Sequence, residues 1–281
     1  MEGAMNRLEV IAGMTLDLAR AELPEYSHPK SPKKFTQPQL LACLVLKAYQ
    51  RSAYRGTEDL LGCADRLRKA LELKQVPDHS TLQKFADRAV SPELLDRMLA
   101  SLNRKLELTA ENAAMDSTGM ESTARSAYYE MRSGGRRKQY LKLSLVILCG
   151  VLMPCVLVIS RGPCNDKREA RTSLILSAKR NWPRRVLADV GHDAEWIHEF
   201  RHGDWKVRSM LRLVSHRADG TAGSHWRSRM LRLPKVHGLR RNIETLMSGL
   251  KRLTGSPLAS RKPNTLDTEA ALRVVDYALY R

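Results

Sequence analysis

The chain has 281 residues and a formal net charge of +18, from 48 Lys and Arg against 30 Asp and Glu. Hydrophobic residues make up 43% of it, which allows a sizeable core and excludes a chain that is disordered throughout. The first ten residues, MEGAMNRLEV, lack an apolar run, so we expect no secretory signal and a cytoplasmic protein. The five cysteines show no C-x2-C spacing, and we expect reduced, mostly buried thiols.

The positive charge is unevenly distributed along the chain. Residues 1–110 hold 17 basic and 14 acidic residues, whereas residues 111–281 hold 31 and 16, a net charge of +15. Clustered basic residues favour a polyanionic partner such as nucleic acid, the alternative being a surface whose charge only aids solubility. The clusters are Arg132, Arg136, Arg137 and Lys138, then Arg184 and Arg185, then the basic residues between Arg227 and Arg241.

The first 110 residues read as a series of helices. Capping signals open three of them, at Thr36, Ser80 and Ser91, and residues 59–73 form another amphipathic candidate. We therefore predict an all-helical N-terminal domain over residues 1–110. Short helices with short turns are compatible with a helix-turn-helix-like DNA-binding module or with a packing or dimerisation domain.

The periodicity changes near residue 112 and predicts a mixed α/β domain over residues 111–281. The apolar stretch 141–159 approaches membrane-spanning length, but Lys142 and Gly150 favour a buried β-hairpin. The predicted strands are 112–120, 140–149, 151–160, 185–190 and 207–214, and the predicted helices follow Asp166 and cover 194–201, 236–253 and 268–280.

Three acidic residues of this second region stand in positions that suggest chemistry. Asp116 interrupts an apolar strand, which is costly unless a ligand or backbone donors match its charge. Asp189 ends a strand, where ligands and metals gather in α/β sheets. Glu244 shares one side of a helix with Arg240 and Lys251, opposite an aliphatic stripe. That side of the helix also fits a solvated ladder of ion pairs.

The local sequences around these acids resemble the catalytic motifs of the DDE-type transposases of bacterial and archaeal insertion sequences. Asp116 stands in MDSTGM, like the family's first aspartate in a strand followed by small residues. Asp189 stands in ADVGHD, which is similar to the family's A-D-x-G-x-D string. The turn at 162–166, GPCND, resembles the family's G-x-x-N-D turn.

The helix adds the fourth element of this resemblance. His237, Arg240, Glu244 and Lys251 have the spacing of the family's Tyr-x2-Arg-x3-Glu-x6-Lys signature, with His in place of Tyr. The resemblance implies an enzyme that cleaves DNA at the ends of an element and joins the 3′-hydroxyl to target DNA. It also implies an RNase H-like mixed five-stranded sheet with flanking helices.

The resemblance further implies a metal-dependent site and DNA partners. The three acids would hold two Mg²⁺ ions, for which Mn²⁺ can substitute, and such ions assist in-line displacement at phosphodiesters. The expected partners are the terminal inverted repeats and target DNA as duplexes, bound by a homodimer on the nucleoid. The residues expected to contact DNA are His237, Arg240, Lys251, Arg136, Arg137 and Lys138.

Two other functions compete with this interpretation. One is a DNA-binding protein derived from a transposase and no longer catalytic. The other is a zinc metallohydrolase, because His198 and His202 form an H-E-x-x-H motif, although Gly203 ends the predicted helix at once. We interpret Asp166 as a turn residue and Asp193 as a helix cap, not as catalytic acids.

Overall fold

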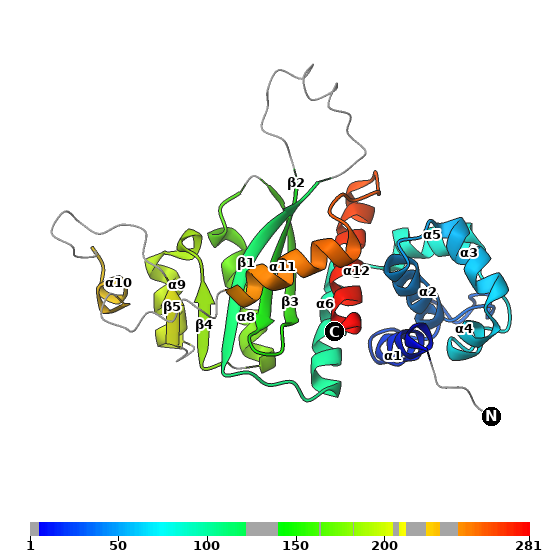
Figure 1. Cartoon of the computed structure of the whole chain (residues 1–281), viewed down its shortest axis with the longest axis horizontal. Helices are drawn as coiled ribbons and strands as arrows, with labels where there is room; N and C mark the ends of the chain where they lie inside the picture. The colour runs from blue at the N-terminus through cyan, green and yellow to red at the C-terminus, as the bar shows by residue number, and fades with distance from the viewer. Residues whose placement is uncertain are drawn as a thin grey trace, which may run out of the picture.

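The computed structural model describes residues 6–121, 140–162, 164–181, 183–204, 208–211, 223–230 and 241–281. Within residues 6–121, six helices precede the first strand (Figure 1). They are α1 (Arg7–Glu22), α2 (Gln37–Tyr49), α3 (Tyr54–Cys63), α4 (Asp65–Ala70), α5 (His79–Ala89) and α6 (Pro92–Lys105).

Three successive strands open the rest of the described chain, and helices with two further strands follow. The strands are β1 (Asn112–Met120), β2 (Tyr140–Leu148), β3 (Met153–Gly162), β4 (Arg185–Ala188) and β5 (Arg208–Leu211). The helices are α8 (Lys167–Asn181), α9 (Glu195–Glu199), α10 (His225–Met230), α11 (Arg241–Thr254) and α12 (Pro263–Tyr280), with the short helical turns η1 (Val190–His192) and η2 (Phe200–Asp204). The structure thus confirms a mixed fold of helices and strands.

Side chains at the helix starts confirm two of the predicted caps and correct the third. The Thr36 hydroxyl accepts a hydrogen bond in a capping box that opens α2, and Ser91 caps α6. Asp78, not Ser80, caps α5, because its carboxylate accepts from the Thr81 backbone N–H at 2.9 Å. The single helix predicted over 59–73 is wrong, because non-helical backbone at Ala64 separates α3 from α4.

The sheet has the strand order β3-β2-β1-β4-β5. Strands β1, β2 and β3 pair antiparallel, whereas β4 runs parallel to both β1 and β5. The predicted hairpin over 141–159 is confirmed, and Gly150 supplies a positive φ of 93° between β2 and β3. In the described part of the chain, no helix is long and apolar enough to cross a membrane.

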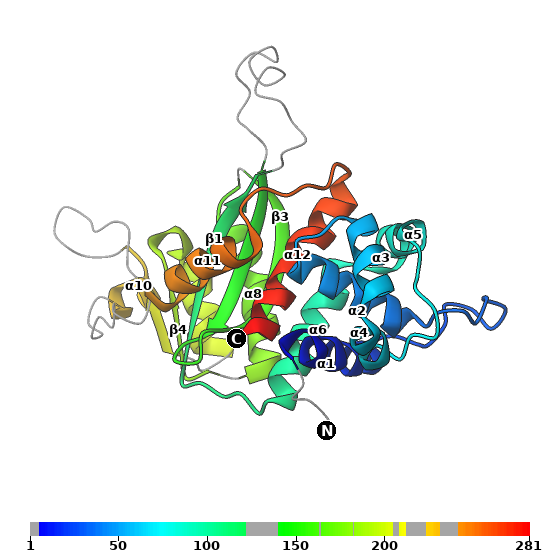
Figure 2. The same ribbon diagram turned by 45° about the vertical axis from the view of Figure 1, so that its right-hand side comes forward.

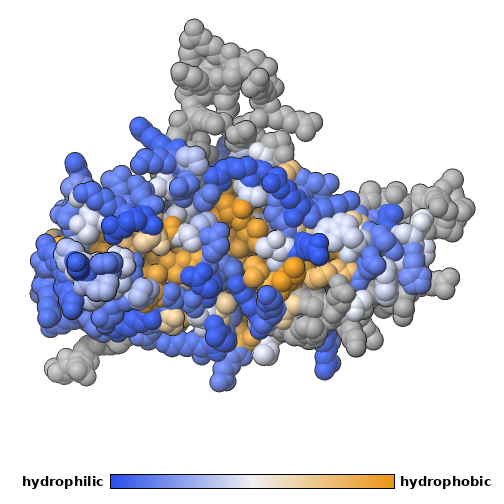
Figure 3. All heavy atoms as spheres, turned by 180° about the vertical axis from the view of Figure 1, so that it is seen from behind, coloured by the Kyte–Doolittle hydropathy of each residue, from blue (hydrophilic) through white to orange (hydrophobic). Residues whose placement is uncertain are grey.

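Alternating side chains direct the two faces of the sheet into different hydrophobic clusters. Ala114 and Met120 of β1 pack in the cluster that includes the apolar stripes of α11 and α12. Ala113 and Met115 pack in the other cluster, which includes Leu174 of α8. Figures 1 and 2 show α11 crossing the face of the sheet, with α12 between the sheet and the N-terminal helices. From behind, hydrophobic residues reach the surface in the middle of a mostly hydrophilic face (Figure 3).

The larger cluster connects the N-terminal helices to the sheet. It includes Leu16 of α1, Leu44 of α2, Leu246 of α11 and Val274 of α12. It is continuous because α12 packs against α2, α5 and α6 as well as against β3. The boundary at residue 110 stays a prediction, and the parts on either side of it share one core.

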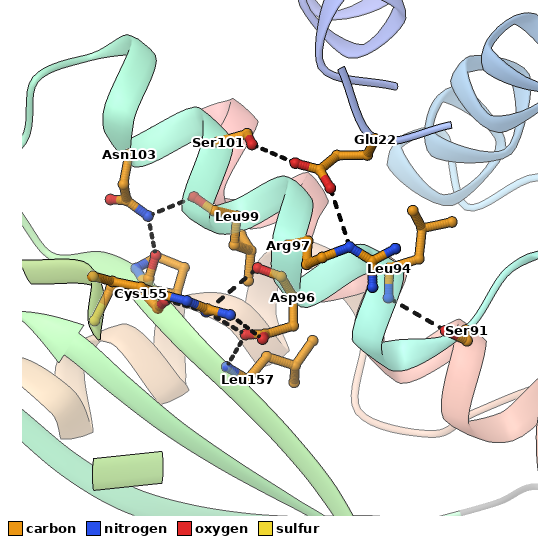
Figure 4. Close-up of polar contacts among 12 residues, drawn as sticks. Glu22, Ser91, Leu94, Asp96, Arg97, Leu99, Ser101, Asn103, Cys155 and Leu157 are labelled. Carbon is orange, nitrogen blue, oxygen red and sulfur yellow. Dashed lines mark hydrogen bonds and ion pairs between the residues drawn. The ribbon is translucent and has the colours of Figure 1, made fainter. Parts of the chain in front are cut away.

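Side chains from α6 and α8 cover the free edge of β3 (Figure 4). The Asp96 carboxylate accepts from the Leu157 N–H at 2.8 Å and pairs with Arg180 at 2.5 Å. Arg180 also donates to the Cys155 carbonyl at 3.0 Å, and Asn103 donates to a carbonyl at the start of β3 at 2.9 Å. These contacts satisfy backbone groups that would otherwise be available for pairing with another strand.

Candidate active site

Strand register places Asp116 and Asp189 next to each other. Met115 of β1 pairs with Ala188 of β4 in parallel register, so the following residues on both strands are neighbours at the carboxyl end of β4. Adjacent strands lie about 4.8 Å apart. Both acids are half-buried, and the Asp116 carboxylate also accepts from the Ser117 N–H at 2.7 Å. The pair offers only oxygen donors, which suits a hard divalent cation such as Mg²⁺.

Glu244 lies on the helix that covers the same face of the sheet. It is exposed in the first turn of α11, whose buried residues Ile243, Leu246 and Leu250 pack in the cluster shared with β1. Side-chain alternation from Ala114 directs Asp116 toward this face. Among the described residues, no three His, Cys, Asp or Glu side chains are close enough together to hold a metal ion. Strand register therefore makes Asp116 and Asp189 neighbours in the sheet, but these two and Glu244 do not form a group of three that could hold a metal ion.

Of the predicted DNA contacts, only Lys251 lies in the described part of the chain. It is half-buried in the last turn of α11, two turns beyond Glu244 on the same helix. The other predicted contacts lie outside the described residues; they are His237, Arg240, Arg136, Arg137 and Lys138.

Sequence reasoning missed a buried lysine whose partner Asp166 lies against the turn that follows Asp189. Lys142 of β2 is 3% exposed, and its ammonium group contacts Asp166 at 2.8 Å, Glu169 at 3.2 Å and the Cys164 carbonyl at 3.0 Å. Burial works against the charge, but the hydrogen bonds to Asp166 and Glu169 outweigh it and raise the pKa of Lys142. Asp166 is thus more than a turn residue, because it belongs to this buried ion cluster.

The turn that follows Asp189 packs closely against the same cluster. A methyl group at Gly191 would stand 2.7 Å from Oδ2 of Asp166, so a larger residue there would have to displace this carboxylate, which pairs with Lys142. His192 donates its backbone N–H to the Asp189 carbonyl at 2.9 Å and is itself buried. Burial lowers the pKa of His192 to about 4, which keeps the ring neutral near pH 7. Packing thus fixes the backbone around Asp189.

Two residues of the neighbouring segment differ from their predicted roles. Asp193 does not cap α9, because the helix begins after Ala194 without a side-chain cap. Its buried carboxylate instead binds His198 Nε2 at 3.2 Å and Arg227 of α10 at 2.7 Å. His198 is buried, and burial lowers its pKa although its hydrogen bond to the Asp193 carboxylate acts in the opposite direction. These contacts give His198 a structural role that connects α9 to α10.

Comparison with known proteins finds similarity in fold but none in sequence family. No family profile and no curated protein matches the sequence. Among solved structures, the chain is similar to the piggyBac transposase in its synaptic complex with hairpin DNA. That similarity has a TM-score of 0.50 and 11% identity, and it covers 98% of this chain and 73% of that chain. The pre-cleavage Mos1 transpososome gives a TM-score of 0.26 at 11% identity, covering 92% of this chain and 79% of that chain. The chain therefore shares its fold with a transposase structure.

Proposed function

We propose that the chain is a DDE-type transposase of an insertion sequence, with an RNase H-like core that cuts element ends and joins them to target DNA. The observation that carries this proposal is the placement of Asp116 and Asp189 side by side at the carboxyl end of β4. The shared fold with the piggyBac transposase supports the class. The strand pattern supports it too, because an antiparallel β1-β2-β3 unit is followed by parallel β4 and β5.

The acidic residues are the proposed metal ligands. Asp116 and Asp189 provide half-buried carboxylates from a fixed backbone, and Glu244 is the proposed third ligand on the same face of the sheet. When bound, two Mg²⁺ ions would activate the attacking oxygen of a phosphodiester displacement and stabilise the leaving oxygen. Lys142 and Asp166 are proposed positioning residues, because they support the turn after Asp189.

The basic residues are the proposed DNA ligands. Lys251 shares α11 with Glu244 and would contact backbone phosphates of the scissile strand. The same role is proposed for residues outside the described part of the chain, which are His237, Arg240, Arg136, Arg137 and Lys138. Joining two ends to one target requires both ends at once, so we propose a homodimer on paired DNA ends.

A strand-cleavage assay tests this proposal. The substrate is a duplex carrying the terminal inverted repeats that flank the gene, incubated with Mg²⁺ or Mn²⁺. Asp116→Asn should lower cleavage by about 100-fold or more, because it removes a proposed ligand without changing the size of the side chain. Asp17→Asn is the matched control, since Asp17 pairs with Lys105 on the exposed surface. Equal cleavage by Asp116→Asn and Asp17→Asn would refute the mechanism.

One observation favours a second candidate, a transposase-derived DNA-binding protein without catalysis. Among the described residues, no three potential metal ligands lie close enough to hold an ion, and this holds for Asp116, Asp189 and Glu244. A protein of this kind would retain terminal-repeat DNA specifically but cut it with neither Mg²⁺ nor Mn²⁺. Metal-dependent cutting by the parent protein would exclude this candidate.

A further inference from the structure

A cationic hollow lies beyond the edge strand β3, on the other side of β2 and β3 from the Asp116–Asp189 pair. Its volume is about 450 Å³. Figure 4 shows part of this region, where the end of α1 meets α6. The polar side chains that line it are Arg97, Asn103 and Arg104 of α6, Lys179 and Arg180 of α8, and Glu22 of α1.

Acidic side chains balance two of the four cations. Arg97 Nε contacts Glu22 at 3.1 Å, and Arg180 pairs with the buried Asp96. Arg104 and Lys179 are exposed, and neither forms an ion pair with the described residues. Arg104 makes a hydrogen bond to the Ser101 hydroxyl at 3.2 Å. Counted over the described residues, the hollow therefore carries two positive charges in excess.

Part of the wall of the hollow is held before any ligand arrives. Acidic partners on different helices hold Arg97 and Arg180, so these two side chains lose little entropy when a ligand binds, whereas the exposed Arg104 and Lys179 must still be ordered. Arg104 and Lys179 lie in the last turns of α6 and α8, where cations also stabilise the helix dipole. The dipole accounts for each of those cations separately. It does not account for their convergence with Arg97, which lies in the second turn of α6.

We propose that this hollow binds phosphate groups of a nucleic-acid backbone, at a site separate from the Asp116–Asp189 pair. The choice of nucleic acid over an acidic protein rests on the proposed function and on the net charge of +18. Arg104 and Lys179 supply the unpaired charges for the phosphates. Such contacts are independent of sequence.

The test measures duplex binding by the full chain in EDTA, which separates binding from any cleavage. A labelled duplex of arbitrary sequence is titrated at several salt concentrations. The test variant is Arg104→Gln/Lys179→Gln. The matched control is Arg55→Gln/Lys69→Gln, which removes the same two charges from exposed positions on α3 and α4. All four residues are exposed, so thermal midpoints should stay close to that of the parent.

Each phosphate contact contributes about 0.9 to the slope of log K against log salt. The test variant should therefore lower that slope by about 1.8 and weaken binding about 30-fold at 0.15 M salt, whereas the control keeps the parent slope. Equal slopes for the two double variants would overturn the proposal. A second measurement adds inorganic phosphate and follows the thermal midpoint. The proposal would also be overturned if phosphate raised the midpoint of the parent but not of the test variant while both bound the duplex equally well, because the hollow would then bind free phosphate. Selective loss of acidic-protein binding with unchanged duplex affinity would overturn it as well. If Asp116→Asn cleaves normally, the proposed catalysis fails but the slope result stands.

Discussion

Asp96→Ala should destabilise the fold strongly, because Asp96 joins α6, β3 and α8 through one carboxylate. The substitution leaves the Leu157 N–H without its acceptor and Arg180 without its acid. The two side chains are only 7% and 15% exposed, so water screens the pair little. Breaking a buried pair costs about 3–5 kcal/mol, and this figure includes the unsatisfied N–H. At about 2 °C per kcal/mol, the melting temperature should fall by about 6–10 °C.

Urea unfolding followed by circular dichroism measures this loss. Asp96→Asn should lie between the parent and Asp96→Ala, since its amide oxygen can still accept from Leu157 while the charge is absent. Asp17→Asn removes one member of an exposed pair and should cost less than about 1 kcal/mol. If Asp96→Ala is no more destabilising than Asp17→Asn, the covered edge of β3 contributes nothing measurable, and the reasoning is wrong.

Further outcomes follow from three buried ionisable groups. Lys142→Met should cost about 3–5 kcal/mol at pH 7 in urea unfolding, and adding Glu169→Gln should recover part of that loss; a larger loss in the double variant would contradict this. Because the pKa of Lys142 is raised, its contribution to the parent's stability is present at neutral pH and is lost as pH rises beyond about 10.4. Burial raises the pKa of Asp276 well above its ordinary value, so stability falls as pH rises above about 4, and Asp276→Asn should be more stable than the parent at alkaline pH. Thermal midpoints at acidic and alkaline pH check this, and a less stable variant at alkaline pH would contradict it. Burial raises the pKa of the Cys43 thiol to about 12, so iodoacetamide should label the exposed Cys63 first in the native protein, and equal labelling rates would argue against the burial of Cys43.

Local signals explain why part of the fold was predictable. The caps at Thr36 and Ser91 involve residues three positions apart, and the hairpin around Gly150 follows from alternation and one glycine. The predicted cap of α5 at Ser80 is wrong by two residues, because Asp78, Ser80 and Thr81 all carry side chains that can cap a helix. Signals of this kind are complete within a few residues of sequence.

The candidate site depended on contacts that sequence spacing does not contain. The neighbouring residues in the sequence mark Asp116 and Asp189 as candidate acids, but their adjacency comes from the parallel register of β1 and β4. The sequence does not reveal the buried ion pair of Lys142, because its partner Glu169 lies 27 residues away. It predicts a cap at Asp193 and not an ion pair, because Arg227, the partner of Asp193 on α10, lies 34 residues away.

The burial of α2 has a consequence for how the protein is made. Leu40 through Leu46 are buried on every side of that helix, and α12 supplies one of the surfaces that cover it. Residues 263–280 leave the ribosome only after the whole sheet has been translated. Until then, the apolar surface of α2 that α12 covers in the folded protein is exposed. Chaperone dependence during translation, and aggregation of fragments that stop before residue 263, are the expected results of this order of synthesis.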